Sequence, residues 1–147
     1  MSHFQFKFTA LLKYRKHQRD LCRQLLGQVL AEETRITQAI GQKDHDKNTV
    51  IDEVRQGTQN EQVEVRQIAA RRFYAGQLTI QKAKLEQELS VVRQQAEHCR
   101  NVLVEADQKV QALEKLEEKQ RQEHEYVVNR KSELQLEEAW VATQFNR

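Results

Sequence analysis

The sequence predicts an all-α protein, a long antiparallel two-helix coiled coil (a helical hairpin) with unequal arms. The 147 residues include no proline and only four glycines, so few positions would end a helix. In the second half of the chain, apolar residues recur in alternating steps of four and three, the 3.5-residue repeat that keeps one helix face against a partner helix. This seam consists of Leu85, Leu89, Val92, Ala96, Cys99, Leu103, Ala106, Val110 and Leu113.

The composition supports helix without a thick core. Hydrophobic residues make up 38% and charged residues 31% of the chain, whereas a globular domain is about 45–50% apolar. Intrinsic disorder is the competing explanation for this polarity, but disordered segments do not keep apolar residues in heptad register. A coiled coil therefore explains the composition better than disorder does.

Charge and hydropathy exclude several function classes. The 24 basic and 22 acidic residues are too balanced to make nucleic acid the expected partner, and basic clusters at 13–23 and 66–72 are interpreted as solvated helix faces. No apolar run approaches the ~18 residues of a membrane helix, and no secretory signal is recognisable. We expect a cytoplasmic protein with no direct membrane insertion, in which two cysteines are too few for a disulfide scaffold.

One domain spanning 1–147 is expected, with helix one over about 4–56, a turn over about 57–60 and helix two over about 61–142. The turn is placed where Gly57 can supply a left-handed conformation and Thr58 or Asn60 can cap the next helix. The seam of helix one has one polar position, at Glu32. Its apolar members are Cys22, Leu25, Val29, Ile36 and Ala39.

Folding about residue 59 sets the expected register. It places Leu25 and Val29 opposite Leu89 and Val92, and Cys22 near Cys99, as packed thiols rather than a disulfide. Helix one would cover helix two only to about Leu113. The seam thins beyond that point, which indicates a partner, although heptads alone do not choose between a hairpin and a four-helix dimer.

No catalytic or metal-binding residue is expected, so we interpret the protein as a non-enzyme without cofactors. The five histidines lack ligand spacing, and no cysteine pair forms a zinc motif. Asp44-His45-Asp46 is interpreted as solvated surface.

Aromatic side chains gather at the two chain ends. Phe4, Phe6, Phe8 and Tyr14 begin helix one, and Trp140 lies near the end of helix two. These residues either form an interface or cap the open end of the hairpin locally. A second group, Phe73, Tyr74 and Leu78, lies near the turn, where core packing also explains Leu78.

The chain resembles the FliJ family of flagellar export proteins. The alternating phenylalanines of Phe4-Gln5-Phe6-Lys7-Phe8 run into Leu11-Leu12 and Arg15, as in that family, and Leu113-Glu114-Lys115-Leu116-Glu117-Glu118-Lys119 is similar to its charged segment. Arg130-Lys131-Ser132-Glu133 and Leu136-Glu137-Glu138-Ala139 are similar to two further elements. Glu137 stands where the family often has aspartate.

The resemblance implies a soluble component of the bacterial flagellar type III export apparatus, at the inner face of the cell membrane. Its partners would be the hexameric export ATPase, the membrane export gate, and export chaperones that it escorts. The protein would stimulate the ATPase in the way that the central stalk of a rotary ATPase does. Tyr74 and Leu78 match the family's gate-binding stripe, whereas Gln81 and Leu85 depart from it. The predicted partner-binding residues are Phe4, Phe6, Phe8, Tyr14, Tyr74, Leu78, Lys115, Lys119 and Trp140.

Two other functions fit the sequence. One is a generic coiled-coil adaptor that holds client segments without a ring partner. The other is the corresponding stalk protein of a virulence-type secretion system.

Overall fold

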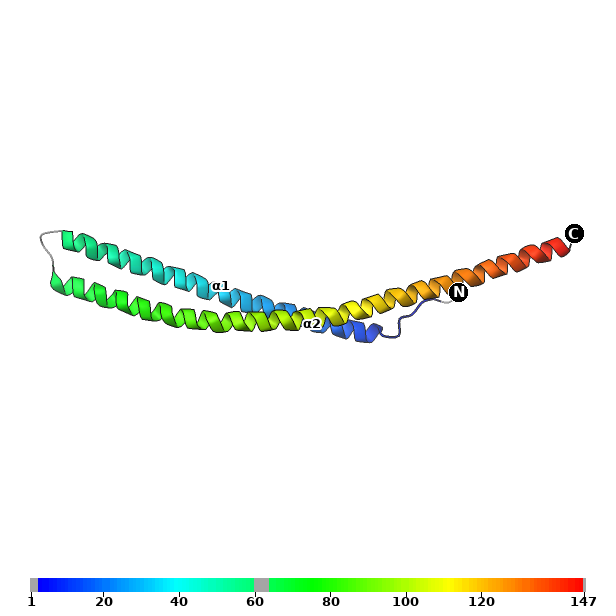
Figure 1. Cartoon of the computed structure of the whole chain (residues 1–147), viewed down its shortest axis with the longest axis horizontal. Helices are drawn as coiled ribbons and strands as arrows, with labels where there is room; N and C mark the ends of the chain where they lie inside the picture. The colour runs from blue at the N-terminus through cyan, green and yellow to red at the C-terminus, as the bar shows by residue number, and fades with distance from the viewer. Residues whose placement is uncertain (1–2, 60–63, 147) are drawn as a thin grey trace. The chain divides into compact units, whose positions relative to one another are not determined.

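A computed structural model describes residues 3–59 and 64–146. It contains helix α1, Thr9–Gln59, and helix α2, Val65–Phe145 (Figure 1). The described residues are almost entirely helical and include no strand. The predicted fold class, an all-α antiparallel hairpin with arms of 51 and 81 residues, is confirmed.

Helix α1 begins at Thr9, later than the expected start near residue 4. The Thr9 hydroxyl donates to the Phe6 carbonyl at 2.7 Å, and the Leu12 N–H donates to the Phe8 carbonyl at 2.8 Å. The Thr9 N–H also donates to the Phe6 carbonyl, at 3.4 Å, so one of the N–H groups that the first turn of a helix leaves free has a partner here. The alternating phenylalanines therefore form a non-helical segment ahead of α1.

The expected left-handed conformation of Gly57 is wrong. Gly57 and Thr58 lie inside α1, and none of the glycines has a positive φ. The Thr58 hydroxyl donates to the Arg55 carbonyl at 2.9 Å, so Thr58 belongs to the last turn of α1 and does not cap α2. The other expected cap, Asn60, lies outside the described residues. Helix α2 starts where the Glu64 carbonyl accepts the N–H groups of Gln67 and Ile68.

The contacts of the chain group into two compact units. The central unit is Arg23–Val102, and the terminal unit combines Met1–Cys22 with Leu103–Arg147. Both units contain a stretch of each helix. Whether the chain acts as one domain stays a prediction.

The central unit is an antiparallel helix pair with a narrow apolar seam. Ile36, Leu89 and Val92 are its buried cluster. Val29, Ile40 and Leu85 pack against them, which confirms the predicted pairing of Val29 with Leu89 and Val92. Leu25 lines a groove together with Val91 and Cys99 of α2, although half of its side chain is exposed.

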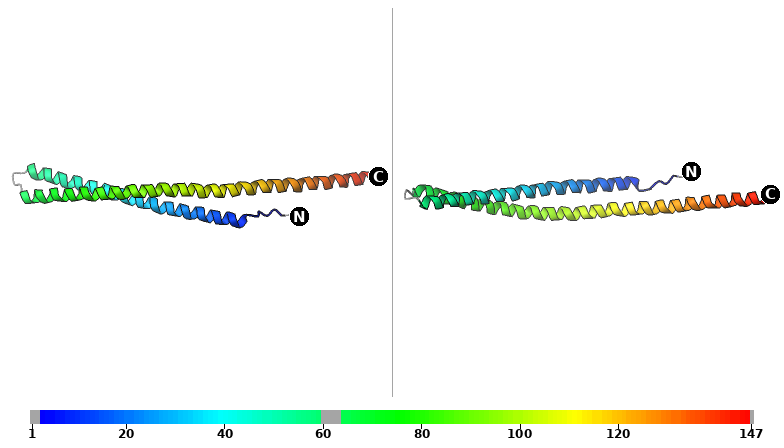
Figure 2. Two further views of the ribbon diagram at one scale, coloured as in Figure 1. Left: turned by 60° about the horizontal axis from the view of Figure 1, so that its bottom comes forward. Right: turned by 90° about the horizontal axis from the view of Figure 1, so that it is seen from above.

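Ion pairs across the central unit show the antiparallel direction. Glu33 pairs with Arg93 at 3.3 Å, Asp44 with Lys82 at 2.7 Å and Glu53 with Arg71 at 3.4 Å. Residue numbers therefore rise along α1 as they fall along α2. Figure 2 shows the same pairing from two further directions, with the cyan part of α1 beside the green part of α2.

The terminal unit has its own core and a long exposed end. Phe6, Leu12 and Val110 are buried together, and Phe4, Leu113 and Leu116 pack against them. Every residue from 125 to 146 is exposed. Among the described residues of this unit, none lies beside the red end of α2, which continues past the N-terminal segment (Figures 1 and 2). The predicted overhang of helix two is present.

Candidate partner-binding surfaces

The N-terminal phenylalanines play different structural roles. Phe6 is buried beside Leu12 and Val110. Phe4 packs against the same cluster, with its ring 5.7 Å from the His124 ring and the Arg121 guanidinium 5.8 Å from its centroid. Both residues therefore cap the terminal unit locally. Phe8 is more exposed and leans edge-on against Phe6 at 5.8 Å.

Tyr14 is the other exposed aromatic residue of this end. Its hydroxyl accepts a hydrogen bond from the Gln18 amide at 2.7 Å, and the Arg15 guanidinium lies 5.9 Å from the ring centroid. Both neighbours come from the same helix, so they hold the ring without covering it. Of the four predicted N-terminal aromatics, Phe8 and Tyr14 are the ones that a partner can reach directly.

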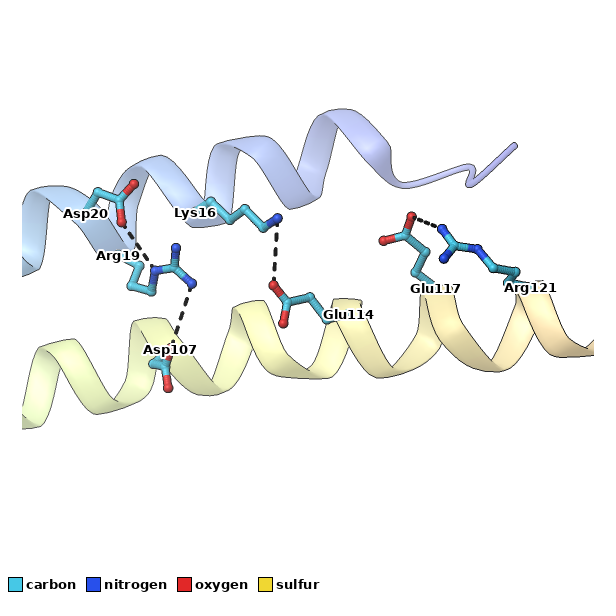
Figure 3. Close-up of polar contacts among 7 residues, drawn as sticks. All are labelled: Lys16, Arg19, Asp20, Asp107, Glu114, Glu117 and Arg121. Carbon is cyan, nitrogen blue, oxygen red and sulfur yellow. Dashed lines mark hydrogen bonds and ion pairs between the residues drawn. The ribbon is translucent and has the colours of Figure 1, made fainter. Parts of the chain in front are cut away.

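Ion pairs hold the first turns of α1 to α2 (Figure 3). Lys16 reaches Glu114 at 3.7 Å, and Arg19 reaches Asp107 at 3.9 Å. Ion pairs near a protein surface contribute at most about 1 kcal/mol each, so these pairs favour a register more than they stabilise the fold. Sequence patterns did not single out these pairs, although opposite charges flanking two facing seams are the signal that would find them.

The charged segment Leu113–Lys119 divides into two faces. Leu113 and Leu116 pack toward the core of the terminal unit. Lys115 and Lys119 are exposed, and Glu117 accepts a contact from Arg121 at 3.4 Å (Figure 3). The two predicted lysines are therefore available for an acidic partner surface.

The second aromatic group divides in the same way. The Leu78 side chain is only 1% exposed, whereas Tyr74 is 49% exposed and Phe73 more so. Tyr74 borders a shallow groove whose other lining residues are Asp46, Thr49, Val50, Glu53, Ala70 and Arg71. A partner can contact Tyr74 and Phe73, whereas Leu78 is buried and out of reach.

The exposed end of α2 carries many uncovered apolar side chains. Trp140 is exposed there, together with Tyr126, Val127, Leu134, Leu136, Val141 and Phe145. An isolated helix of this length is marginal in water. Exposed aromatic and aliphatic side chains at this density are typical of a binding surface.

Two ion pairs shift the pKa values of their members. A hydrogen bond to Asp44 raises the pKa of Lys82 above its ordinary value, against a smaller opposing effect of burial. Hydrogen bonds from Arg35 lower the pKa of Glu32, the polar member of the α1 seam. Glu86 adds a weaker effect of the same sign at Lys82, and both shifts therefore come from surface carboxylates and guanidinium groups, which is the pattern of structural ion pairs.

Among the described residues, no three His, Cys, Asp or Glu side chains come together as metal ligands. In the Asp44-His45-Asp46 stretch, Asp44 binds Lys82 and Asp46 accepts from Gln42. Cys22 and Cys99 are free thiols. Neither α1 nor α2 has a stretch apolar enough, over enough length, to span a lipid bilayer.

Comparison with protein families gives one decisive match. The family model described as flagellar FliJ protein matches residues 4–147. The chain belongs to the FliJ family. It is therefore a component of flagellar type III protein export. Comparisons with curated proteins and with solved structures give no match.

The FliJ-like motifs can be located in the structure. The alternating phenylalanines at the start form the cap of the terminal unit, and the charged segment faces them from α2. The last two FliJ-like elements, at 130–133 and 136–139, lie on the exposed end of α2. Family resemblance and packing thus coincide for the first two motifs, whereas the last two take no part in the packing of the unit.

Proposed function

We propose that this chain is a stalk-like coupling protein that links the flagellar export ATPase ring to the membrane export gate. The observation that carries the proposal is FliJ membership over 4–147 together with an α2 end that is exposed from 125 to 146. A helix end that has no packing partner within its unit is free to enter a ring of other subunits. The chain supplies binding surface, and the ATPase supplies the chemistry.

The ATPase ring would contact the terminal unit. Exposed Trp140 on α2, Phe8 and Tyr14 near the start of α1, and the lysines Lys115 and Lys119 are the side chains available to it. Aromatic side chains dominate many interfaces because they bury much area at small entropic cost. Phe4 and Phe6 would act by holding the N-terminal segment in place.

The export gate would contact the central unit near the start of α2. Tyr74 and Phe73 are the exposed aromatics there, and buried Leu78 fixes the helix beneath them. Binding to the gate would also place the chain at the inner face of the cell membrane without any membrane-spanning segment of its own.

Two single substitutions test these assignments against each other. Trp140→Ala should weaken binding to the purified flagellar export ATPase, and stimulation of its turnover, by about tenfold or more. Tyr74→Ala should leave ATPase stimulation unchanged and weaken binding to the cytoplasmic part of the export gate protein. Both side chains are exposed, so neither change should unfold the chain.

Each variant serves as the control for the other. Wild-type protein that leaves ATPase hexamer formation and turnover unchanged would overturn the stalk proposal. Equal loss of both activities in both variants would contradict the separation of the two surfaces. A generic adaptor would bind clients normally in both variants and ignore the ATPase.

An apolar groove in the central unit favours a second role as an escort of export chaperones. Leu25, Val29, Val91 and Cys99 line it, with glutamine and histidine side chains at its rim. A groove of this kind fits the apolar face of a single amphipathic helix.

Val91 and Val104 provide a matched pair for this role, because each side chain is 54% exposed and Val104 is not among the residues that line the groove. Val91→Lys should weaken chaperone binding in calorimetry, while Val104→Lys should bind as the wild type does. Equal binding by both variants would count against the groove.

A further inference from the structure

The exposed end of α2 has an apolar stripe of its own. Val127, Leu134 and Val141 follow at seven-residue intervals, and all three are exposed. Seven residues are almost two helical turns, so these side chains lie on one face with a drift of about 20° per step. Three apolar residues on one face of an unpacked helix are the minimal seam for a partner helix.

Charges flank this stripe symmetrically about Leu134. Arg130 and Lys131 precede it by four and three residues, and Glu137 and Glu138 follow it by three and four. All four side chains are exposed. A half-turn about Leu134 thus exchanges the two valines of the stripe and replaces each basic residue by an acidic one.

We propose that a second copy of this chain docks antiparallel on residues 126–142, with Leu134 of one copy opposite Leu134 of the other. The half-turn then aligns Val127 of each copy with Val141 of its partner. Arg130 meets Glu137 of the other copy on one flank of the seam, and Lys131 meets Glu138 on the other flank. The contact is isologous, so each pair occurs twice.

Charge complementarity selects a second copy over other occupants. An unrelated helix would have to reproduce the basic-apolar-acidic order in reverse, whereas a second copy does so by symmetry. A parallel pair would place basic beside basic and acidic beside acidic at each level, which costs free energy. The antiparallel arrangement removes both repulsions.

The interface is short and therefore weak. Residues 126–142 span about 25 Å of helix at 1.5 Å per residue. Two segments of this length bury less surface area than a standard protein interface does. We expect a dissociation constant on the order of 10–100 μM. The dimer would occupy the same stretch of α2 as Trp140, which the proposed function offers to the ATPase ring, so the two associations would compete for this end of the helix.

Charge reversal in two complementary variants tests this interface in the full-length chain. Glu137→Lys with Glu138→Arg makes the flanks wholly basic, and Arg130→Glu with Lys131→Glu makes them wholly acidic. In sedimentation equilibrium up to about 500 μM, wild type should dimerise, each variant alone should associate at least tenfold more weakly, and an equimolar mixture should restore a heterodimer. The control Arg66→Glu with Arg72→Glu makes the same charge change as Arg130→Glu with Lys131→Glu, at exposed positions elsewhere, and should dimerise as the wild type does.

Cross-linking tests the direction of the two helices. In a background without Cys22 and Cys99, chains carrying Val127→Cys should form disulfides with chains carrying Val141→Cys and few with themselves. A monomeric wild type, variants that dimerise normally, a mixture that stays monomeric, or self-linked Val127→Cys chains would each overturn the proposal. These measurements involve no ATPase, so their failure would leave the stalk function untouched, and failure of the stalk function would not affect them.

Discussion

Ile36 and Ile80 are the same residue type in opposite environments. The Ile36 side chain is 1% exposed within the cluster of Leu89 and Val92, whereas Ile80 is 52% exposed on α2. Both lie inside helices, so replacement by alanine changes helix propensity equally at the two sites. The difference between the two variants therefore isolates burial.

Ile36→Ala should lower the free energy of unfolding by about 2–4 kcal/mol, through lost apolar transfer and the cavity left behind. Ile80→Ala should change it by less than about 0.5 kcal/mol. Denaturant unfolding followed by circular dichroism measures both. Equal losses would mean that the seam of the central unit does not stabilise the chain.

Glu32 shows how a polar residue is accommodated in an apolar seam. Two nitrogens of Arg35 reach its carboxylate, at 2.9 and 2.6 Å, and these bonds lower its pKa. A lowered folded-state pKa contributes stability above the ordinary value near 4.5, and this stability is lost as the pH falls through the lowered pKa.

The variant Arg35→Gln should therefore raise the pKa of Glu32 in a carbon-13 NMR titration. Its stability should lie slightly below that of the wild type at neutral pH and converge with it in acid, because protonated Glu32 no longer attracts Arg35. Thr34→Gln, which alters a neighbouring exposed residue, should leave the Glu32 titration unchanged. An unaltered pKa in Arg35→Gln would contradict the assigned cause.

At the scale of the elements, heptad spacing predicted which faces are buried better than it predicted where the helices begin. The nine seam residues of α2 are all at least half-buried in the structure, because a 3.5-residue repeat admits only one face to a partner helix. Leu25 is more exposed than Leu26 beside it, which is equally apolar. Spacing alone does not separate two adjacent leucines.

The helix ends were harder to predict, because each prediction depended on single residues that occur both inside and outside helices. Glycine is tolerated inside a helix as well as after it. The residues that follow Gly57, which are Thr58, Gln59 and Asn60, did not fix the position at which α1 ends. The alternating phenylalanines did not reveal that their segment is packed and non-helical, because Phe6 packs with Val110, which is more than a hundred residues away in the sequence. The aromatic residues of the candidate surfaces were found from sequence, but their exposure depends on such distant contacts.

Gly57→Ala tests the helical assignment directly. In α1 a methyl group at this position would lie 3.8 Å from the Arg71 guanidinium, an ordinary contact, and Gly57 has no positive φ. Alanine should therefore stabilise the chain by about 0.5–1 kcal/mol. Gly41→Ala, with open space around the new methyl group, should give a similar gain and serves as the control. A loss of stability in Gly57→Ala but not in Gly41→Ala would mean that Gly57 adopts the left-handed conformation after all.

At the scale of the whole molecule, the packing predicts a steep gradient of stability along α2. Residues 85–113 carry the seam, whereas those from 125 to 146 are exposed without exception. Local opening costs little free energy where few apolar contacts hold a helix. Although α2 is one continuous helix, its seam-bearing part should therefore resist local opening, whereas its exposed end should open easily.

Hydrogen exchange at low chain concentration, where the self-association proposed above is absent, should show this gradient. Amides near Leu89 and Val92 should exchange only in global unfolding, and amides beyond residue 125 should exchange many times faster. Removal of residues 125–147 should leave the free energy of unfolding within about 0.5 kcal/mol of the wild-type value, because no core residue loses a neighbour. A large loss of stability on truncation would mean that the end of α2 supports the fold. In that case it could not be held in reserve for a partner, and both the ring-binding surface and the antiparallel dimer would have to be sought elsewhere on the chain.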